Sequence, residues 1–197
     1  MPRVKPFRGL RPPSHLAAQV SSRPYDVLNS AEAREECCGN EKSLYHIIRP
    51  EINFPEGTDE HDSRVYSEAQ RQLAHFIEQG WLVQDQKSCY YLYAQTMNGH
   101  IQYGIVLTAH VDDYNNGLIK KHELTRRDKE DDRMKHLFAT NAHIGSAFLA
   151  FKHNPILVRL IDRIAQGQPE FDFVADIDGF RHTLWVIDDT DDIATIT

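Results

Sequence analysis

The chain has 197 residues, of which 41% are hydrophobic and 26% are charged, and its formal net charge is −7. This composition is typical of a globular protein, and no run of about 18 apolar residues is present that could span a membrane. An acidic chain also lacks the basic face on which general nucleic-acid binding depends. We therefore expect no membrane or nucleic-acid partner and, because the N-terminus has no secretory signal, a cytoplasmic location.

Five prolines in the first 25 residues predict an N-terminal arm over residues 1–28 with one short helix over 14–22. The end of this arm, 23–28, is predicted to be extended, because a residue before proline avoids the α region. Asn29 is predicted to cap a second short helix, with Glu32 reaching back to the cap. The apolar segment 43–48 favours a strand.

A loop is expected over 50–62, followed by a helix that Ser63 caps and that closes at Gly80. Asn98-Gly99 then joins two alternating segments, which predicts a β-hairpin. Asp112-Asp113 is typical of a turn before Asn115-Asn116-Gly117.

The segment 128–140 is predicted to be a helix with Met134, Leu137 and Phe138 facing inward, and 144–151 a strand. Asn154-Pro155 predicts a further helix start. Two strands over 170–178 and 182–187 and a helix cap at Asp189 complete the pattern. These elements predict an α+β fold with a mixed, largely antiparallel sheet and flanking helices, forming one domain over 1–197.

The most charged stretch of the chain, 120–133, lies where a strand is expected to give way to a helix. A helix start attracts anions, and arginine binds phosphate through two parallel hydrogen bonds. The functional hypothesis places phosphate against arginines and lets a carboxylate hold magnesium or accept a proton. The residues concerned are His122, Glu123, Thr125, Arg126, Arg127, Asp132 and Arg133.

The alternative interpretation of this stretch is a solvated helix face. Its like-charged pairs four residues apart, Asp128 with Asp132 and Lys129 with Arg133, are mildly unfavourable and argue weakly for an outside ligand. No phosphate-binding glycine loop, dinucleotide fingerprint or zinc-protease motif is present, and we predict no resident metal site.

Four blocks of the sequence, in this order, resemble the DUF1015 (domain of unknown function) family. They are 4–12, 22–27, 40–47, and 121–125 together with 130–133. The resemblance spans nearly the whole chain and adds Arg23, Tyr25, Asp26 and Ser43 to the candidate substrate-binding or phosphate-binding residues. Because members of the family are about twice this length, the chain resembles an N-terminal portion, with a C-terminal part missing.

The missing part of such proteins normally holds an Asp-Gly-His-His-Arg motif similar to one in free serine kinases of the ParB and sulfiredoxin type. The resemblance therefore implies a phosphotransferase of serine metabolism in the full-length protein. Its phosphoryl donor would be a nucleotide or pyrophosphate with Mg²⁺, and its partner a small phosphorylated metabolite. The alternative is a non-catalytic module that binds a nucleotide or phosphorylated metabolite.

Overall fold

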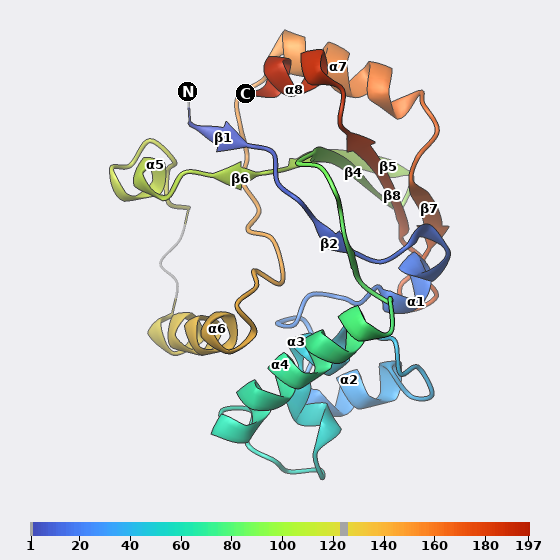
Figure 1. Cartoon of the computed structure of the whole chain (residues 1–197), viewed down its shortest axis with the longest axis vertical. Coiled ribbons are helices and arrows are strands. Elements are labelled where there is room, and N and C mark those ends of the chain that lie inside the picture. Colours follow the sequence, from blue (N-terminus) through green and yellow to red (C-terminus); the bar gives the residue numbers. More distant parts are fainter. Residues whose placement is uncertain (1, 123–125) are drawn as a thin grey trace. The chain divides into compact units, whose positions relative to one another are not determined.

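The computed structural model describes residues 2–122 and 126–197, and these fold into two compact units (Figure 1). Unit 1 comprises the described residues within 1–15, 84–124 and 148–197. Unit 2 comprises those within 16–83 and 125–147. The proline-rich arm expected over 1–28 is therefore divided between the two units.

Unit 1 is built on a four-stranded antiparallel sheet with the strand order β5-β4-β8-β7. Asn98 and Gly99 join its hairpin with φ angles of 51° and 78°, the pair of positive values that a type I′ turn requires. The predicted hairpin and antiparallel sheet are confirmed. The strands are β4 (Tyr90–Met97), β5 (His100–Val106), β7 (Phe171–Val174) and β8 (Arg181–Ile187).

One face of this sheet carries the apolar core of unit 1, and helices α7 (Pro155–Ala165) and α8 (Thr190–Ile196) contact it. Alternate residues of a strand point to one face, so a single apolar set on β4 and β8 is sufficient to build this layer. The buried members are Tyr90, Leu92, Ala94, Trp185 and Ile187.

The remaining elements of unit 1 are short. Strand β1 (Val4–Lys5) pairs antiparallel with β6 (Thr108–Ala109), and β2 is Leu10–Arg11. The turn predicted at Asp112-Asp113 is wrong, because these residues lie in helix α5 (Val111–Asn115). Buried Asp113 accepts hydrogen bonds from the backbone and guanidinium of Arg3, a long-range contact that a local pattern does not reveal.

Unit 2 is helical. The short helix predicted over 14–22 is present as η1 (Ser14–Leu16), which begins in unit 1, followed by α1 (Ala17–Val20). The other elements are α2 (Ser30–Glu36), α3 (Tyr45–Ile48), η2 (Pro50–Asn53), α4 (Ser63–Glu78) and α6 (Arg127–Thr140). Strand β3 (Val83–Gln84) lies where the chain passes from unit 2 to unit 1.

The apolar core of unit 2 is formed by α2, α3 and η2, which bury Leu28, Ala33, Cys37, Tyr45, Ile48 and Ile52. The capping box at Asn29 is confirmed: its side chain accepts from the Ala31 and Glu32 amides, and Glu32 accepts from the Asn29 amide. None of the described helices is long and apolar enough to cross a membrane.

Three further predicted local structures are wrong. Residues 43–48 include helix α3 in place of a strand, and Pro50, which disfavours helical geometry at Arg49, limits α3 to one turn. Residues 144–151 form no described strand, since Gly145 adopts a φ of 95° and its neighbours pair with no other strand. The segment 23–28 contains a turn closed by the Val27 amide on the Pro24 carbonyl.

The buried face of α6 is also different from the prediction. Met134 and Phe138 are 46% and 78% exposed, whereas Asp132, His136 and Thr140 are buried. The helix therefore packs against the rest of unit 2 through its polar side, which brings ionisable groups into the interior of this unit.

Candidate functional site

A polar pocket lies within unit 2, between the α3–η2 segment, the start of α4 and helix α6. Its free space is about 10 Å³, which is room for about one water molecule, so the lining side chains contact one another. The lining residues are Tyr25, Ile48, Arg49, Pro50, Glu51, Glu60, Val65, Tyr66, Lys129, Asp132, Arg133 and His136. Most of them are ionisable or polar, as expected for a binding site and unusual for a core.

Helix α6 contributes four residues to this pocket at helical spacing. Lys129, Asp132, Arg133 and His136 follow the i, i+3, i+4, i+7 pattern that places side chains on one face of a helix. The helix ends at Asn141, which adopts the left-handed conformation with a φ of 50°. Helix α6 thus presents a continuous stripe of charged and polar side chains to the pocket.

Asp132 is held by four hydrogen bonds. Its Oδ1 accepts from the Tyr66 hydroxyl at 2.7 Å and contacts His61 Nδ1 at 3.2 Å. Its Oδ2 accepts from Arg133 Nε at 3.1 Å and Arg133 Nη2 at 2.6 Å. Burial alone raises the pKa of Asp132, but the bonds from Tyr66 and Arg133 outweigh burial and hold the pKa below its usual 3.8. Asp132 is therefore a carboxylate at neutral pH.

The Arg133 guanidinium also lies over the ring of Tyr25, with its central carbon 3.9 Å from the ring centroid. This distance is well within the range of a cation–π contact. Burial is the main cause that raises the pKa of Tyr25, so its hydroxyl stays protonated. Asp132 and Tyr25 together fix the guanidinium in one orientation, with its side chain still 31% exposed.

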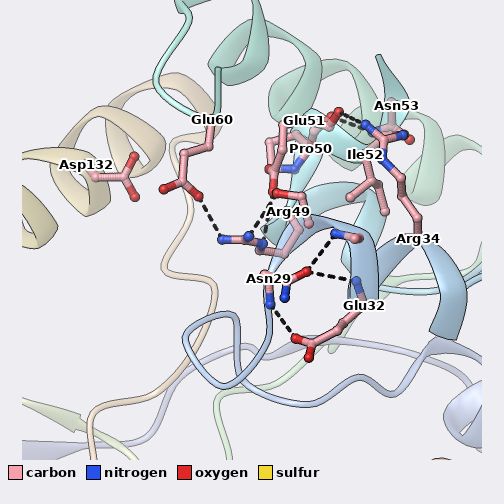
Figure 2. Close-up of polar contacts among 12 residues, drawn as sticks. Asn29, Glu32, Arg34, Arg49, Pro50, Glu51, Ile52, Asn53, Glu60 and Asp132 are labelled. Atoms are coloured by element: carbon pink, nitrogen blue, oxygen red, sulfur yellow. Dashed lines mark hydrogen bonds and ion pairs between the residues drawn. The ribbon is translucent and has the colours of Figure 1, made fainter. Parts of the chain in front are cut away.

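Arg49 is the most buried cation of the pocket and lies at the centre of a second network (Figure 2). Its side chain is 10% exposed, and that of Glu51 is 3% exposed. Arg49 Nη1 donates to Glu60 Oε2 at 3.0 Å and Arg49 Nη2 donates to the Ser30 hydroxyl at 3.1 Å. The Ser30 hydroxyl in turn donates to Glu51 at 2.8 Å.

One donor of Arg49 is poorly used. Its Nε lies 3.0 Å from Glu51 Oε1, which is an ion-pair distance, yet it has no partner of hydrogen-bond geometry among the described residues. A buried donor in this state carries a free-energy cost that a better-aligned acceptor would remove.

His136 completes the pocket in a defined tautomer. Its Nε2 lies 2.8 Å from the Ile47 carbonyl oxygen, and a carbonyl only accepts, so Nε2 carries the proton. Burial lowers the pKa of His136 below its usual 6.5, with a smaller contribution of the same sign from Arg133. The neutral ring therefore keeps an unprotonated Nδ1 at pH 7.

The structure brings three of the sequence-predicted site residues together in this pocket: Tyr25, Asp132 and Arg133. Arg126 is 75% exposed and pairs with Asp128 on the surface, and Arg127 is also exposed. Asp26 is exposed, and neither it nor these two arginines lines the pocket. The predicted cluster of three arginines is therefore represented here by Arg133 alone.

Two further candidates have internal roles. Arg23 pairs with Glu36, and the Arg23 amide donates to the Tyr45 hydroxyl. Buried Ser43 lies directly before α3, and its hydroxyl accepts from the Tyr45 amide. Exposed His122 belongs to unit 1, whereas Glu123 and Thr125 lie outside the described residues.

Residues that the sequence analysis did not select include Arg49, Glu60, Tyr66, Lys129 and His136. The sequence of α6 carried a signal for two of them, Lys129 and His136. The polar residues of this helix recur at the same helical spacing that marks an apolar stripe. Arg49 directly follows the one-turn helix α3, and Glu60 lies in a loop. No periodic pattern marks either position.

Comparison with curated proteins and with solved structures gave no match to this chain. A family model described as "Protein of unknown function (DUF1015)" matches residues 4–197. This match covers nearly the whole chain, including every residue of the pocket. The chain therefore belongs to the DUF1015 family.

Proposed function

We propose that unit 2 binds a phosphorylated small molecule and that the full-length protein is a phosphotransferase of serine metabolism. The observation that carries this proposal is the convergence of Arg49, Lys129 and Arg133 on one pocket. Guanidinium groups suit phosphate because their planar fork matches two phosphate oxygens. The substrate would be serine or phosphoserine, as the resemblance to free serine kinases implies.

The reaction would exchange one phosphorus–oxygen bond for another. The serine hydroxyl would attack the terminal phosphorus of a nucleotide or pyrophosphate, the bond to the donor's bridging oxygen would break, and the donor would leave with that electron pair. The hydroxyl proton needs an acceptor, and the neutral His136 ring has one at Nδ1. Asp132 is a weaker base because its pKa is lowered.

Most of the rate in such a reaction comes from positioning and charge neutralisation, which assigns Arg49, Lys129 and Arg133 the main role. No three metal-binding side chains converge within residues 2–122 and 126–197. Mg²⁺ commonly takes only one or two protein carboxylates together with substrate phosphates. Asp132 would be this carboxylate, and the ion would neutralise charge on the transferred group.

A non-catalytic binding module is the second candidate. It is favoured by the four hydrogen bonds to Asp132, which use this carboxylate to orient Arg133 and leave it little capacity for chemistry. In this case the pocket would bind the phosphorylated metabolite without turnover.

The test combines calorimetry with a turnover assay. Full-length protein is titrated with O-phosphoserine and separately incubated with O-phosphoserine, ADP and Mg²⁺, with ATP and free serine measured. We expect binding that Arg133→Met weakens by about 10- to 100-fold, the equivalent of one charged hydrogen-bonding group. Arg71→Met is the matched control, because Arg71 is 64% exposed and pairs with Glu68 outside the pocket.

Binding with ATP and serine production supports the phosphotransferase. Binding without turnover supports the binding module. Equal affinity of the wild type and Arg133→Met, or no binding at all, would contradict the placement of phosphate in this pocket.

A further inference from the structure

Glu60 differs from the other carboxylates of the pocket. It lies in the irregular segment between η2 and α4, and its side chain is 39% exposed, against 3% for Glu51 and 9% for Asp132. Its contacts are with cationic or ionisable groups: Arg49 Nη1 at 3.0 Å and His61 Nε2 at 3.8 Å. Figure 2 shows the carboxylate pointing from its loop toward the Arg49 guanidinium. It is therefore an anion presented to the buried arginine from the solvent side.

The charges of the pocket balance only while Glu60 is in place. The three cations Arg49, Lys129 and Arg133 face the three carboxylates Glu51, Glu60 and Asp132. His136 is neutral, because burial lowers its pKa. If the Glu60 carboxylate moved out, a positive charge would remain beside Arg49.

Lys129 carries part of this excess positive charge. It lines the same pocket, yet no acidic side chain of the described residues lies within ion-pair distance of its ammonium. An incoming anion therefore finds one cation free and a second, Arg49, whose Nε lacks an aligned acceptor. A phosphate dianion has enough charge and oxygen atoms to use both.

We infer that the Glu60 carboxylate occupies the position of the ligand's phosphate group and is displaced when the ligand binds. This inference rests on the proposed function and adds to it the position of the phosphate, at Arg49 Nη1. It also adds that the protein's own Glu60 competes with the ligand for Arg49, which limits the affinity. It also gives a specificity: a carboxylate ligand offers two acceptor oxygens to the cations of the pocket, whereas a phosphomonoester offers three terminal oxygens. Phosphomonoesters are therefore preferred over carboxylates of the same size.

The narrowness of the pocket fits this role. Only about 10 Å³ is free, far less than a phosphate group needs, so a lining group must leave. Glu51 and Asp132 are each held by buried partners, Ser30 for the former and Tyr66 for the latter. Glu60 is the most exposed of the three carboxylates and hence costs least to move into water.

The test uses Glu60→Gln, which preserves side-chain shape and removes the charge. Its matched control is Glu56→Gln, at an exposed position of the same loop. Full-length variants are titrated with O-phosphoserine and with inorganic phosphate, and circular dichroism checks that they are folded. We expect Glu60→Gln to bind both probes about 10-fold more tightly than the wild type, whereas Glu56→Gln does not change the affinity.

The two proposals fail in different ways. If the wild type binds and Glu60→Gln binds equally or more weakly, the competing role of Glu60 is overturned and the proposed function stands. If neither protein binds a phosphate probe, the proposed function fails and this inference fails with it. Should Glu60→Gln not fold, Glu60→Asp, which shortens the reach to Arg49 by one methylene, is expected to tighten phosphate binding, and unchanged or weaker binding overturns the inference.

Discussion

The interiors of the two units differ in chemistry. Unit 1 buries an apolar sheet face under two helices, and its Arg3–Asp113 ion pair keeps the arginine 56% exposed. Unit 2 buries the Arg49–Glu51 pair, with side chains 10% and 3% exposed, beside its apolar core. A buried ion pair rarely stabilises more than apolar residues of the same volume. The difference is the one expected from our proposal that unit 2 keeps its charges for a ligand.

The largest expected effect comes from breaking the buried pair of unit 2. Glu51→Ala removes the carboxylate that forms an ion pair with Arg49 and accepts from the Ser30 hydroxyl. We expect the free energy of unfolding, measured by urea denaturation, to fall by about 3–5 kcal/mol, because a buried charge loses its compensation.

Glu51→Gln is the control for this change, since it keeps the shape and one acceptor oxygen, and it should cost less than the alanine variant. A loss below about 1 kcal/mol for Glu51→Ala would show that Arg49 is adequately neutralised by Glu60 alone. The contrast between the units would then be weaker than the exposures suggest.

A smaller effect on the free energy of unfolding is expected from a change of pH. It arises from one histidine in each unit. Burial lowers the pKa of His136 in unit 2 and of His182 in unit 1 below the usual 6.5. Between the lowered value and 6.5 the unfolded chain binds more protons than the folded one. Stability is therefore fully present above about pH 7 and falls as the pH decreases through 6.5.

Each histidine should contribute a separable part of this loss. His136→Gln and His182→Gln are each expected to flatten the decline in unfolding free energy between pH 7 and 5, and the double variant should flatten it most. His15→Gln, at an exposed position, serves as the control. A decline that remains unchanged in the double variant would assign the pH dependence to other groups.

The sequence predicted well those features that depend on neighbouring residues. The Asn98-Gly99 hairpin, the caps at Asn29 and Asn154 and the extent of α6 follow from local conformational preferences. The fold class follows from their order. The one-turn helix α3 was missed because its apolar residues fit a strand equally well, and only Pro50 and tertiary packing decide between the two.

The pocket was predictable only in part. Tyr25 and Arg133 are more than a hundred residues apart in the sequence, so their contact depends on tertiary structure. The family resemblance selected Tyr25 and the charged stretch selected Arg133, whereas the hydrophobic pattern misoriented α6 by assuming that Met134 and Phe138 must be buried. The regular spacing of Lys129, Asp132, Arg133 and His136 was the available signal for the correct face.

The smallest expected effect concerns the helix caps, which should not distinguish the units. Asn29 in unit 2 accepts from the Ala31 and Glu32 amides at 2.9 and 3.0 Å, and Asn154 in unit 1 accepts from two amides at 2.9 and 3.4 Å. Asn→Ala at either position is expected to lower the unfolding free energy by about 1 kcal/mol, and Asn→Gly by a few tenths. Urea denaturation of the four variants measures this.

Equal losses of unfolding free energy at the two caps would mean that hydrogen bonding of the helix-start amides contributes alike in both units. The difference between the two units would then lie in their buried side chains. A markedly larger cost at Asn29 has a specific meaning. Its capping box includes the return bond from the Asn29 amide to Glu32, at 2.7 Å, and α2 carries Ser30, which contacts both Arg49 and Glu51. The excess would then measure how strongly the start of α2 supports the charged pocket.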